Sequence, residues 1–319
     1  MPEWLRQAII DTWHSRTGLV LALVAAFQRL VPLVTKFDLS AGGGMKTVVS
    51  TAFLACALAT SVNAQWLNHR DPNIPRTADG TPNLAAPPPR FNGKPDLSGV
   101  WEAERTSADE YSTALGPGFA QLQVDFNDVT KHVLNAFWGV KPGEEPFTSE
   151  GVAAFRQRQA QGVQGALSAC LPAGLPVNLF VLWFKMIQAP GEIVVIPGTG
   201  DPPRQIYTDG RSLPRDPEPS WTGHSVGAWQ GDTLVVETVG IHPRAALDAF
   251  GHPRSEQMRI TERYHRRDFG HIDLEITLED PKYYTRPFDI KTTLKLVADS
   301  DVLDYVCSEN EKDGAHLKK

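Results

Sequence analysis

The residues from Trp221 to Val239, WTGHSVGAWQGDTLVVETV, constrain the fold most, because they have the form of a β-hairpin. Gln230-Gly231-Asp232 is a tight-turn sequence, and aromatic and β-branched residues, which favour strands, flank it. From Leu179 onward the chain repeats this pattern of short alternating segments separated by turn residues. The predicted strands are 180–189, 192–197, 204–209, 222–229, 233–239, 256–266, 271–279, 287–298 and 302–308.

Short connections favour antiparallel neighbours, and a run of such strands must protect its edges from pairing with other chains. We therefore predict a mainly β protein, an antiparallel meander closed into a lipocalin-like barrel. A two-sheet β-sandwich is the alternative. Residues 97–101 are expected to add a first strand, and apolar residues at spacings of three and four predict a small helical insertion at about 115–165.

Residues 45–64 have the form of a secretory signal peptide, with a lysine at its start, an apolar stretch and a small-residue cleavage site. Residues 1–44 are expected to be a non-native extension from an upstream start; the alternative is a membrane-anchoring helix at about 19–34. Residues 65–98 then form an extended, proline-rich arm, and 99–319 a single barrel domain. We expect export to the periplasm or the extracellular space, with no stable membrane span in the mature chain.

Cleavage after residue 64 would remove Cys56 and leave Cys170 and Cys307 as the cysteines of the mature chain. Two cysteines in an exported protein are expected to form a disulfide. The alternative is two separate buried thiols.

Several functional classes are disfavoured by the composition. The formal net charge is −6 and no basic cluster occurs, which argues against a nucleic-acid partner. The histidines are scattered without metal-binding spacing, and the sequence contains no GxSxG, P-loop or GxGxxG motif. We expect no metal and no organic cofactor, and a small molecule as the ligand or substrate.

Counting alternate residues on the strand 256–266 places Glu262 on the same apolar face as Ile260 and Tyr264. A carboxylate on such a face must be paired or must change its pKa, and such groups are candidates for function. Glu262 is therefore the leading catalytic candidate. The alternative is a structural ion pair with one of three residues: Arg259, Arg263 or Arg286.

His224 is the second catalytic candidate, because it falls in line with Val226 and Ala228 and is expected to face inward. A core histidine with its hydrogen bonds satisfied is the alternative. Three aromatic residues would line the lumen and bind substrate, unless they are plain packing, and Glu309 near the chain end joins them. The substrate-binding candidates are thus Tyr264, Tyr207, Trp221 and Glu309.

The longest connection in the strand-rich half, 240–256, offers a further site, because loops at a barrel mouth often carry chemistry. His252 could form a general acid/base pair with Asp248, or with Glu256 four residues on. The alternative is a polar lid with a helical turn at 245–250.

Several runs of this chain resemble a large family of exported bacterial proteins that has no established reaction. They are Trp66–Asp71, Lys94–Trp101, Ile206–Arg211 (IYTDGR), Trp229–Thr238 (WQGDTLVVET), Thr261–Arg263 (TER) and Cys307–Asp313 (CSENEKD). The resemblance covers nearly all of the mature chain. It implies export and one domain type, and no catalytic residues.

Three functions are compatible with this pattern. The first is an exported enzyme, a cofactor-independent hydrolase or lyase, with Glu262, His224, His252 and Asp248 acting at the barrel mouth. Its substrate would be small and partly apolar or carbohydrate-like. The second is a lipocalin-like protein that binds a small molecule in its lumen without catalysis. The third is an envelope interaction protein that uses the proline-rich arm.

Overall fold

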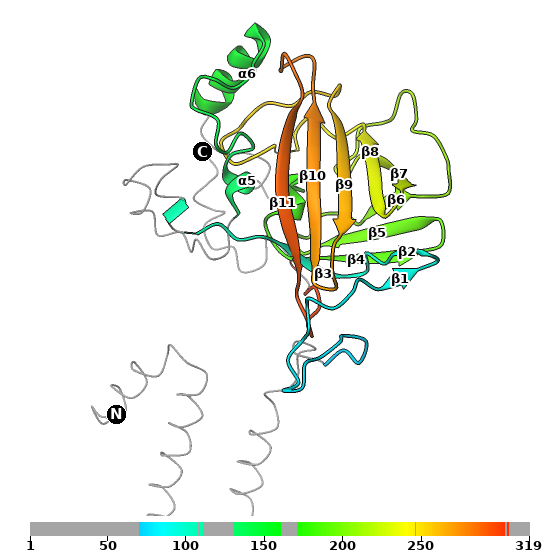
Figure 1. The fold of residues 1–319 in the computed structure, drawn as a ribbon. Coiled ribbons are helices and arrows are strands. Elements are labelled where there is room, and N and C mark those ends of the chain that lie inside the picture. The colour runs from blue at the N-terminus through cyan, green and yellow to red at the C-terminus, as the bar shows by residue number, and fades with distance from the viewer. Residues whose placement is uncertain are drawn as a thin grey trace, which may run out of the picture. The chain divides into compact units, whose positions relative to one another are not determined.

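A closed barrel of nine strands forms the body of the protein, as the computed structural model shows (Figure 1). The structure describes residues 70–107, 109–110, 130–160, 171–245, 247–303 and 305. The barrel strands are β3 (Gly99–Ala103), β4 (Phe184–Ala189), β5 (Glu192–Pro197), β6 (Arg204–Tyr207), β7 (His224–Gln230), β8 (Thr233–Val239), β9 (Arg259–Arg266), β10 (His271–Glu279) and β11 (Phe288–Leu296). The predicted mainly β, closed-barrel fold is confirmed.

The strands follow one another around the barrel in chain order, and β11 closes the ring by pairing with β3 through Leu294 and Ala103. All neighbouring pairs are antiparallel except β6 and β7, which run parallel, with Ile206 opposite Ser225. The expectation of a purely antiparallel meander is therefore wrong at this one step. The connection 208–223 is long enough for the crossover that a parallel pair needs.

The strand predicted at 302–308 is not found in its described residues 302, 303 and 305, and the remainder lies outside the described residues. The strand that follows β11 around the barrel is β3, from the start of the domain. The predicted signal peptide, both cysteines of the expected disulfide and Glu309 also lie outside the described residues.

Part of the arm ahead of the barrel forms a small hairpin of β1 (Arg90–Phe91) and β2 (Lys94–Pro95). Asn92 and Gly93 make its turn with φ angles of 49° and 78°, the left-handed pair that suits a two-residue hairpin loop. Arg90 donates to Asp232 at 2.8 Å, in the turn between β7 and β8. The arm is thus held against the barrel by contacts with the turn of the organising hairpin.

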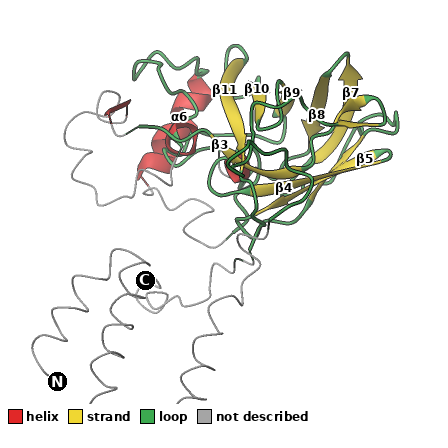
Figure 2. Ribbon diagram, turned by 60° about the horizontal axis from the view of Figure 1, so that its bottom comes forward, coloured by secondary structure: helices red, strands yellow, loops and turns green. Residues whose placement is uncertain are grey.

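The described helices are α5 (Lys131–Leu134), α6 (Ser149–Ala160) and the 3₁₀ turn η3 (Val177–Leu179). Thr148 caps the start of α6, since its hydroxyl accepts a hydrogen bond from the Gly151 amide at 3.0 Å. Only Gly151 of α6 is buried, and the helix lies beside β11 in both views (Figures 1 and 2). In the described part of the chain, no helix is long and apolar enough to cross a membrane.

Large side chains fill the barrel interior. On β10 the alternation is as predicted, with Ile272, Leu274, Ile276 and Leu278 buried. Residues from other strands meet them, so the described interior is a packed core rather than an open lumen. The largest fully buried side chains are Trp101, Arg204, Arg254, Tyr264, Phe184, Leu97, Leu175, Leu179, Met186, Ile193 and Ile206.

Candidate functional site

Glu262 lies inside the barrel, as its strand parity predicts, and is fully buried. Its partner is Arg204 on β6, whose Nη1 donates to Oε1 at 2.9 Å and whose Nη2 donates to Oε2. Arg204 thus reaches across the interior past β7 and β8. The alternative of a structural ion pair is right in kind, but its partner is none of the three arginines expected, because those side chains are exposed.

Every nitrogen of the Arg204 guanidinium meets an oxygen atom. Nε donates to Ser225 Oγ at 3.0 Å, and Nη2 also donates to Thr238 Oγ1 at 2.8 Å. The Tyr264 hydroxyl donates to Glu262 Oε1 at 2.7 Å. Such a satisfied network specifies strand register and leaves Glu262 without a free position for a substrate.

The pKa values of this network agree with a fixed ion pair. Burial would lower the pKa of Arg204, but the charge of Glu262 and its hydrogen bonds outweigh burial and raise that pKa above its usual value. Burial, followed by the charge of Glu262, raises the pKa of Tyr264 well above its ordinary range. The tyrosine therefore stays neutral and serves as a hydrogen-bond donor.

The inward orientation predicted for His224 is wrong. Its side chain is half-buried, and Nε2 lies 2.9 Å from the Glu218 carbonyl oxygen. On β7 the buried position is Ser225, whose hydroxyl oxygen accepts a hydrogen bond from Arg204 Nε. At Gly227 an added Cβ would meet Ile206 at 3.2 Å, which places that residue on the inner face as well. Of the β7 residues with this parity, Ser225 and Gly227 carry no apolar signal, and Trp229 is only partly buried against the core. Alternation of apolar residues therefore gave the wrong face for this strand.

The aromatic residues predicted to line a lumen have different places. Tyr264 is inside the barrel, but Tyr207 is half-buried, with the Arg211 guanidinium 3.6 Å from its ring centroid. Trp221 is partly buried at the edge of the core and stacks on His242 at 4.5 Å between ring centroids. Tyr207 and Trp221 therefore do not join Glu262 in one site.

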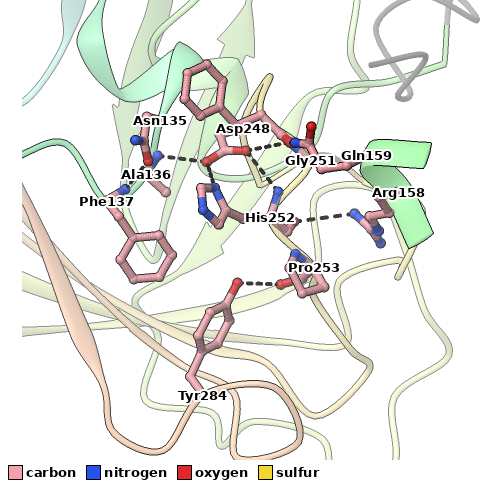
Figure 3. Close-up of polar contacts among 11 residues, drawn as sticks. Asn135, Ala136, Phe137, Arg158, Gln159, Asp248, Gly251, His252, Pro253 and Tyr284 are labelled. Carbon is pink, nitrogen blue, oxygen red and sulfur yellow. Dashed lines mark hydrogen bonds and ion pairs between the residues drawn. The ribbon is translucent and has the colours of Figure 1, made fainter. Parts of the chain in front are cut away.

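The loop between β8 and β9 does bring two predicted residues together. Asp248 Oδ2 and His252 Nδ1 share a short hydrogen bond, and both side chains are buried (Figure 3). Asp248 also accepts from three backbone amides: Ala136 at 2.8 Å, Gly251 at 2.9 Å and His252 at 3.1 Å. The alternative of an exposed polar lid is wrong, because this loop is largely buried.

Aromatic rings surround His252. Its imidazole stacks on Phe155 of α6 at 4.7 Å with an interplanar angle of 7°, and Phe137 lies 4.9 Å away. Phe147 is 5.8 Å away and contacts Tyr284, whose hydroxyl donates to the Pro253 carbonyl at 2.7 Å. The site is thus a buried dyad under rings from four separate segments, and Figure 3 shows the dyad with Phe137 and Tyr284.

The second ring nitrogen of His252 has no hydrogen-bond partner among the described residues, although only 1% of the side chain is exposed. Since Nδ1 faces the Asp248 carboxylate, the neutral imidazole carries its proton there and presents a lone pair at Nε2. A buried acceptor without a partner costs free energy. The arrangement therefore favours a proton acceptor over a purely structural pair.

A hollow of about 650 Å³ lies at the end of the barrel opposite to the dyad, between the arm and the ends of β9 and β11. Its charged residues already have partners: Lys185 bonds Asp301 at 2.8 Å, and Arg266 donates to backbone carbonyls. This cleft has the size of a ligand site, but it offers no unpaired acid or base for proton transfer.

Sequence reasoning missed Arg204 and the aromatic surroundings of His252. The parity of β6 could have found Arg204, because it shares a face with the buried Ile206. No local pattern joins Phe137, Phe147 and Phe155 to the dyad. Among the described residues, no group of three or more His, Cys, Asp or Glu side chains is placed to hold a metal ion.

Searches against protein-family models, curated proteins and solved structures found no match to this chain. The family resemblance drawn from its motifs stays a prediction.

Proposed function

We propose that the protein is an exported enzyme in which His252 and Asp248 transfer protons at one end of the barrel. The observation that carries this proposal is the pairing of a buried, carboxylate-bound Nδ1 with an Nε2 that has no partner among the described residues. Glu262 has no catalytic part in it, because Arg204 and Tyr264 occupy its oxygens.

The dyad suits hydrolysis or elimination. Nε2 would accept a proton from an attacking water or from a substrate carbon, and Asp248 would stabilise the imidazolium that forms. The same Nε2 would then return the proton to the leaving group. The three backbone amides on Asp248 hold the carboxylate in place, so the imidazole keeps one orientation through both steps.

The surroundings of the dyad support a small, partly apolar or carbohydrate-like substrate. The rings of Phe137, Phe147 and Phe155 offer apolar faces next to the imidazole. Flat apolar groups and the apolar faces of sugars pack well against such rings.

The test begins with a thermal-shift screen of small metabolites on the purified mature protein, followed by assay of each hit for turnover. His252→Phe keeps a ring in the aromatic stack and removes the proton acceptor. We expect it to stay folded and to lose turnover by about 10²- to 10⁴-fold. His224→Phe is the matched control. It makes the same replacement at a histidine that lies on the outer face of β7, away from the dyad. Full turnover by His252→Phe would show the assignment to be wrong.

A non-catalytic binding protein is the second candidate, and the cleft of about 650 Å³ between the arm and the barrel favours it. The filled barrel interior gives no support to a ligand in the lumen. Ile187→Trp in the cleft lining, where the side chain is exposed, would then block ligand binding, whereas His252→Phe would leave it intact.

Export is the remaining part of the proposal. It is supported by the signal-peptide pattern of residues 45–64 and by the motif resemblance to exported proteins. N-terminal sequencing of the protein recovered from the periplasm or medium should give Gln65 as the first residue. Recovery of the uncleaved chain in the cytoplasm would contradict it.

A further inference from the structure

Arg254, two residues after His252, is a buried cation for which the described part of the chain provides no oxygen acceptor. Its side chain is among the largest that are fully buried. Nη2 lies 3.4 Å from the sulfur of Met258, which is a weak acceptor, and Nε and Nη1 have no partner among the described residues. A buried guanidinium in this state costs much free energy unless an anion joins it.

The other buried arginines do not share this property. Arg204 donates to Glu262 and to two hydroxyls. Arg266 donates to backbone carbonyls, including those of Asp96 and Phe269. The fold thus satisfies a buried guanidinium at two other places, and the lack of acceptors is local to the loop that carries the dyad.

The carboxylates of Asp248, in the same loop, and of Asp280, directly after β10, are already engaged. Asp280 accepts from the Ser255 amide at 2.6 Å and the Ser255 hydroxyl at 2.8 Å, and Asp248 holds the dyad. Burial lowers the pKa of Arg254 to about 10, against a partial compensation from Tyr284 and these carboxylates. Arg254 therefore remains a cation at neutral pH, and its donors are left for another acceptor.

We propose that Arg254 binds the carboxylate of the substrate, a small monocarboxylic acid whose apolar body packs among the rings around His252. This inference rests on the proposed function and names its substrate class. A carboxylate is favoured over a phosphate dianion, because Arg254 offers a single buried guanidinium beside apolar rings, and burying a second negative charge there would cost more free energy.

Helix α6 covers this site, held by the stacking of Phe155 on His252, a hydrogen bond from Gln159 to the Phe250 carbonyl and an ion pair of Glu150 with Lys282 at 3.3 Å. Of its residues only Gly151 is buried. Arg158 reaches the carbonyls of His252 and Pro243 at 3.4 and 3.5 Å, at the weak limit of hydrogen bonding (Figure 3 shows the first of these bonds). A small outward shift of α6 would lift Phe155 from the imidazole and admit a ligand.

The test is calorimetric titration of the whole mature protein with three probes: benzoate, its neutral analogue benzamide, and inorganic phosphate. We expect saturable binding of benzoate and none of benzamide or phosphate. Arg254→Met should weaken benzoate binding about ten- to hundredfold, the loss of one charge-assisted interaction. Arg254→Lys should retain part of it, and Arg263→Met, an exposed arginine on β9, should leave it unchanged.

Three results would overturn the anion site: no binding of benzoate at millimolar concentration, equal binding of benzamide, or unchanged benzoate binding by a folded Arg254→Met. Binding of phosphate without benzoate would overturn the choice of carboxylate. If the proposed catalytic role of the dyad is wrong but the anion site is right, His252→Phe would keep turnover while benzoate binding would still depend on Arg254. Failure of the anion site alone would leave the loss of turnover in His252→Phe intact.

Discussion

Arg204 and Arg254 are both fully buried, but they have opposite surroundings. Every nitrogen of Arg204 meets an oxygen, from Glu262, Ser225 or Thr238. Among the described residues, Arg254 meets only the sulfur of Met258. The pKa of Arg204 is raised by its carboxylate partner despite burial, whereas burial lowers that of Arg254 to about 10. The same type of side chain is thus fully satisfied at one place, and at the other it has no oxygen acceptor among the described residues.

This difference follows a general pattern. Proteins satisfy buried polar groups where stability is the only demand, and they leave exceptions mainly at functional sites. The dyad and Arg254 lie in one loop, and the unpartnered Nε2 of His252 belongs to the same exception. The satisfied and unsatisfied clusters should therefore respond to substitution with opposite signs.

The largest effect is expected from Arg204→Met. It leaves the Glu262 carboxylate buried without its cation, so the free energy of unfolding should fall by about 3–5 kcal/mol. Urea unfolding followed by tryptophan fluorescence would measure it. Adding Glu262→Gln should restore part of the loss. A fall of less than about 1 kcal/mol in the single variant would refute the structural role of this pair.

The next effect is a loss of stability at low pH. It tests whether buried groups that lack hydrogen-bond partners make the protein sensitive to pH. His132 on α5 is buried, with no hydrogen-bond partner at either ring nitrogen among the described residues. Burial, helped by the charge of Lys131, lowers its pKa to about 4. The folded pKa is below the unfolded value, so this contribution to stability is present above about pH 6.5 and is lost as pH falls toward 4.

At pH 5 the unfolding free energy should be about 2 kcal/mol lower than at pH 7.5 on account of His132 alone. His132→Phe should remove that part of the pH dependence, with urea unfolding at both pH values as the measurement. His265→Phe, on the exposed side of β9, serves as the control. An identical pH profile in His132→Phe and the parent chain would contradict the assignment.

Arg254→Met should stabilise the protein. Methionine fills a similar volume without a buried charge, so the free energy of unfolding is expected to rise by about 1–2 kcal/mol. The sign is the decisive result, since Arg204→Met has the opposite one. Thermal unfolding without ligand would measure it, and a loss of stability equal to that of Arg204→Met would end the contrast between the two sites.

The smallest effect is expected from Ser225→Ala, which removes the acceptor of Arg204 Nε and makes Arg204 slightly more like Arg254. A loss of about 1 kcal/mol is expected, because the ion pair with Glu262 remains. Ser98→Ala, whose hydroxyl accepts from the half-buried Gln188 amide, is a comparison at a less buried place. An unchanged unfolding midpoint in Ser225→Ala would show that Nε finds another acceptor.

Alternation along the strands predicted much of the fold. On β9 and β10 it placed Glu262, Tyr264 and the four apolar residues of β10 correctly, because large apolar side chains there alternate with charged ones. On β7 it failed, because two of the three residues on the inner face, Ser225 and Gly227, carry no apolar signal, and only Trp229 does. The acid/base pair of His252 and Asp248 was predicted from loop length and residue type, and the structure brings the two side chains together.

The sequence by itself determined that this chain is a strand-rich barrel with a carboxylate in its interior, because strand periodicity and turn residues are local properties that neighbouring residues express. Only the tertiary structure decided which buried charges have partners. Arg204 and Glu262 are 58 positions apart. Phe137 and Phe155, whose rings lie beside His252, are separated from it in the sequence by strands β4 to β8. Whether a buried charge has an ion-pair or hydrogen-bond partner depends on distances across the folded interior, and no local sequence pattern encodes those distances.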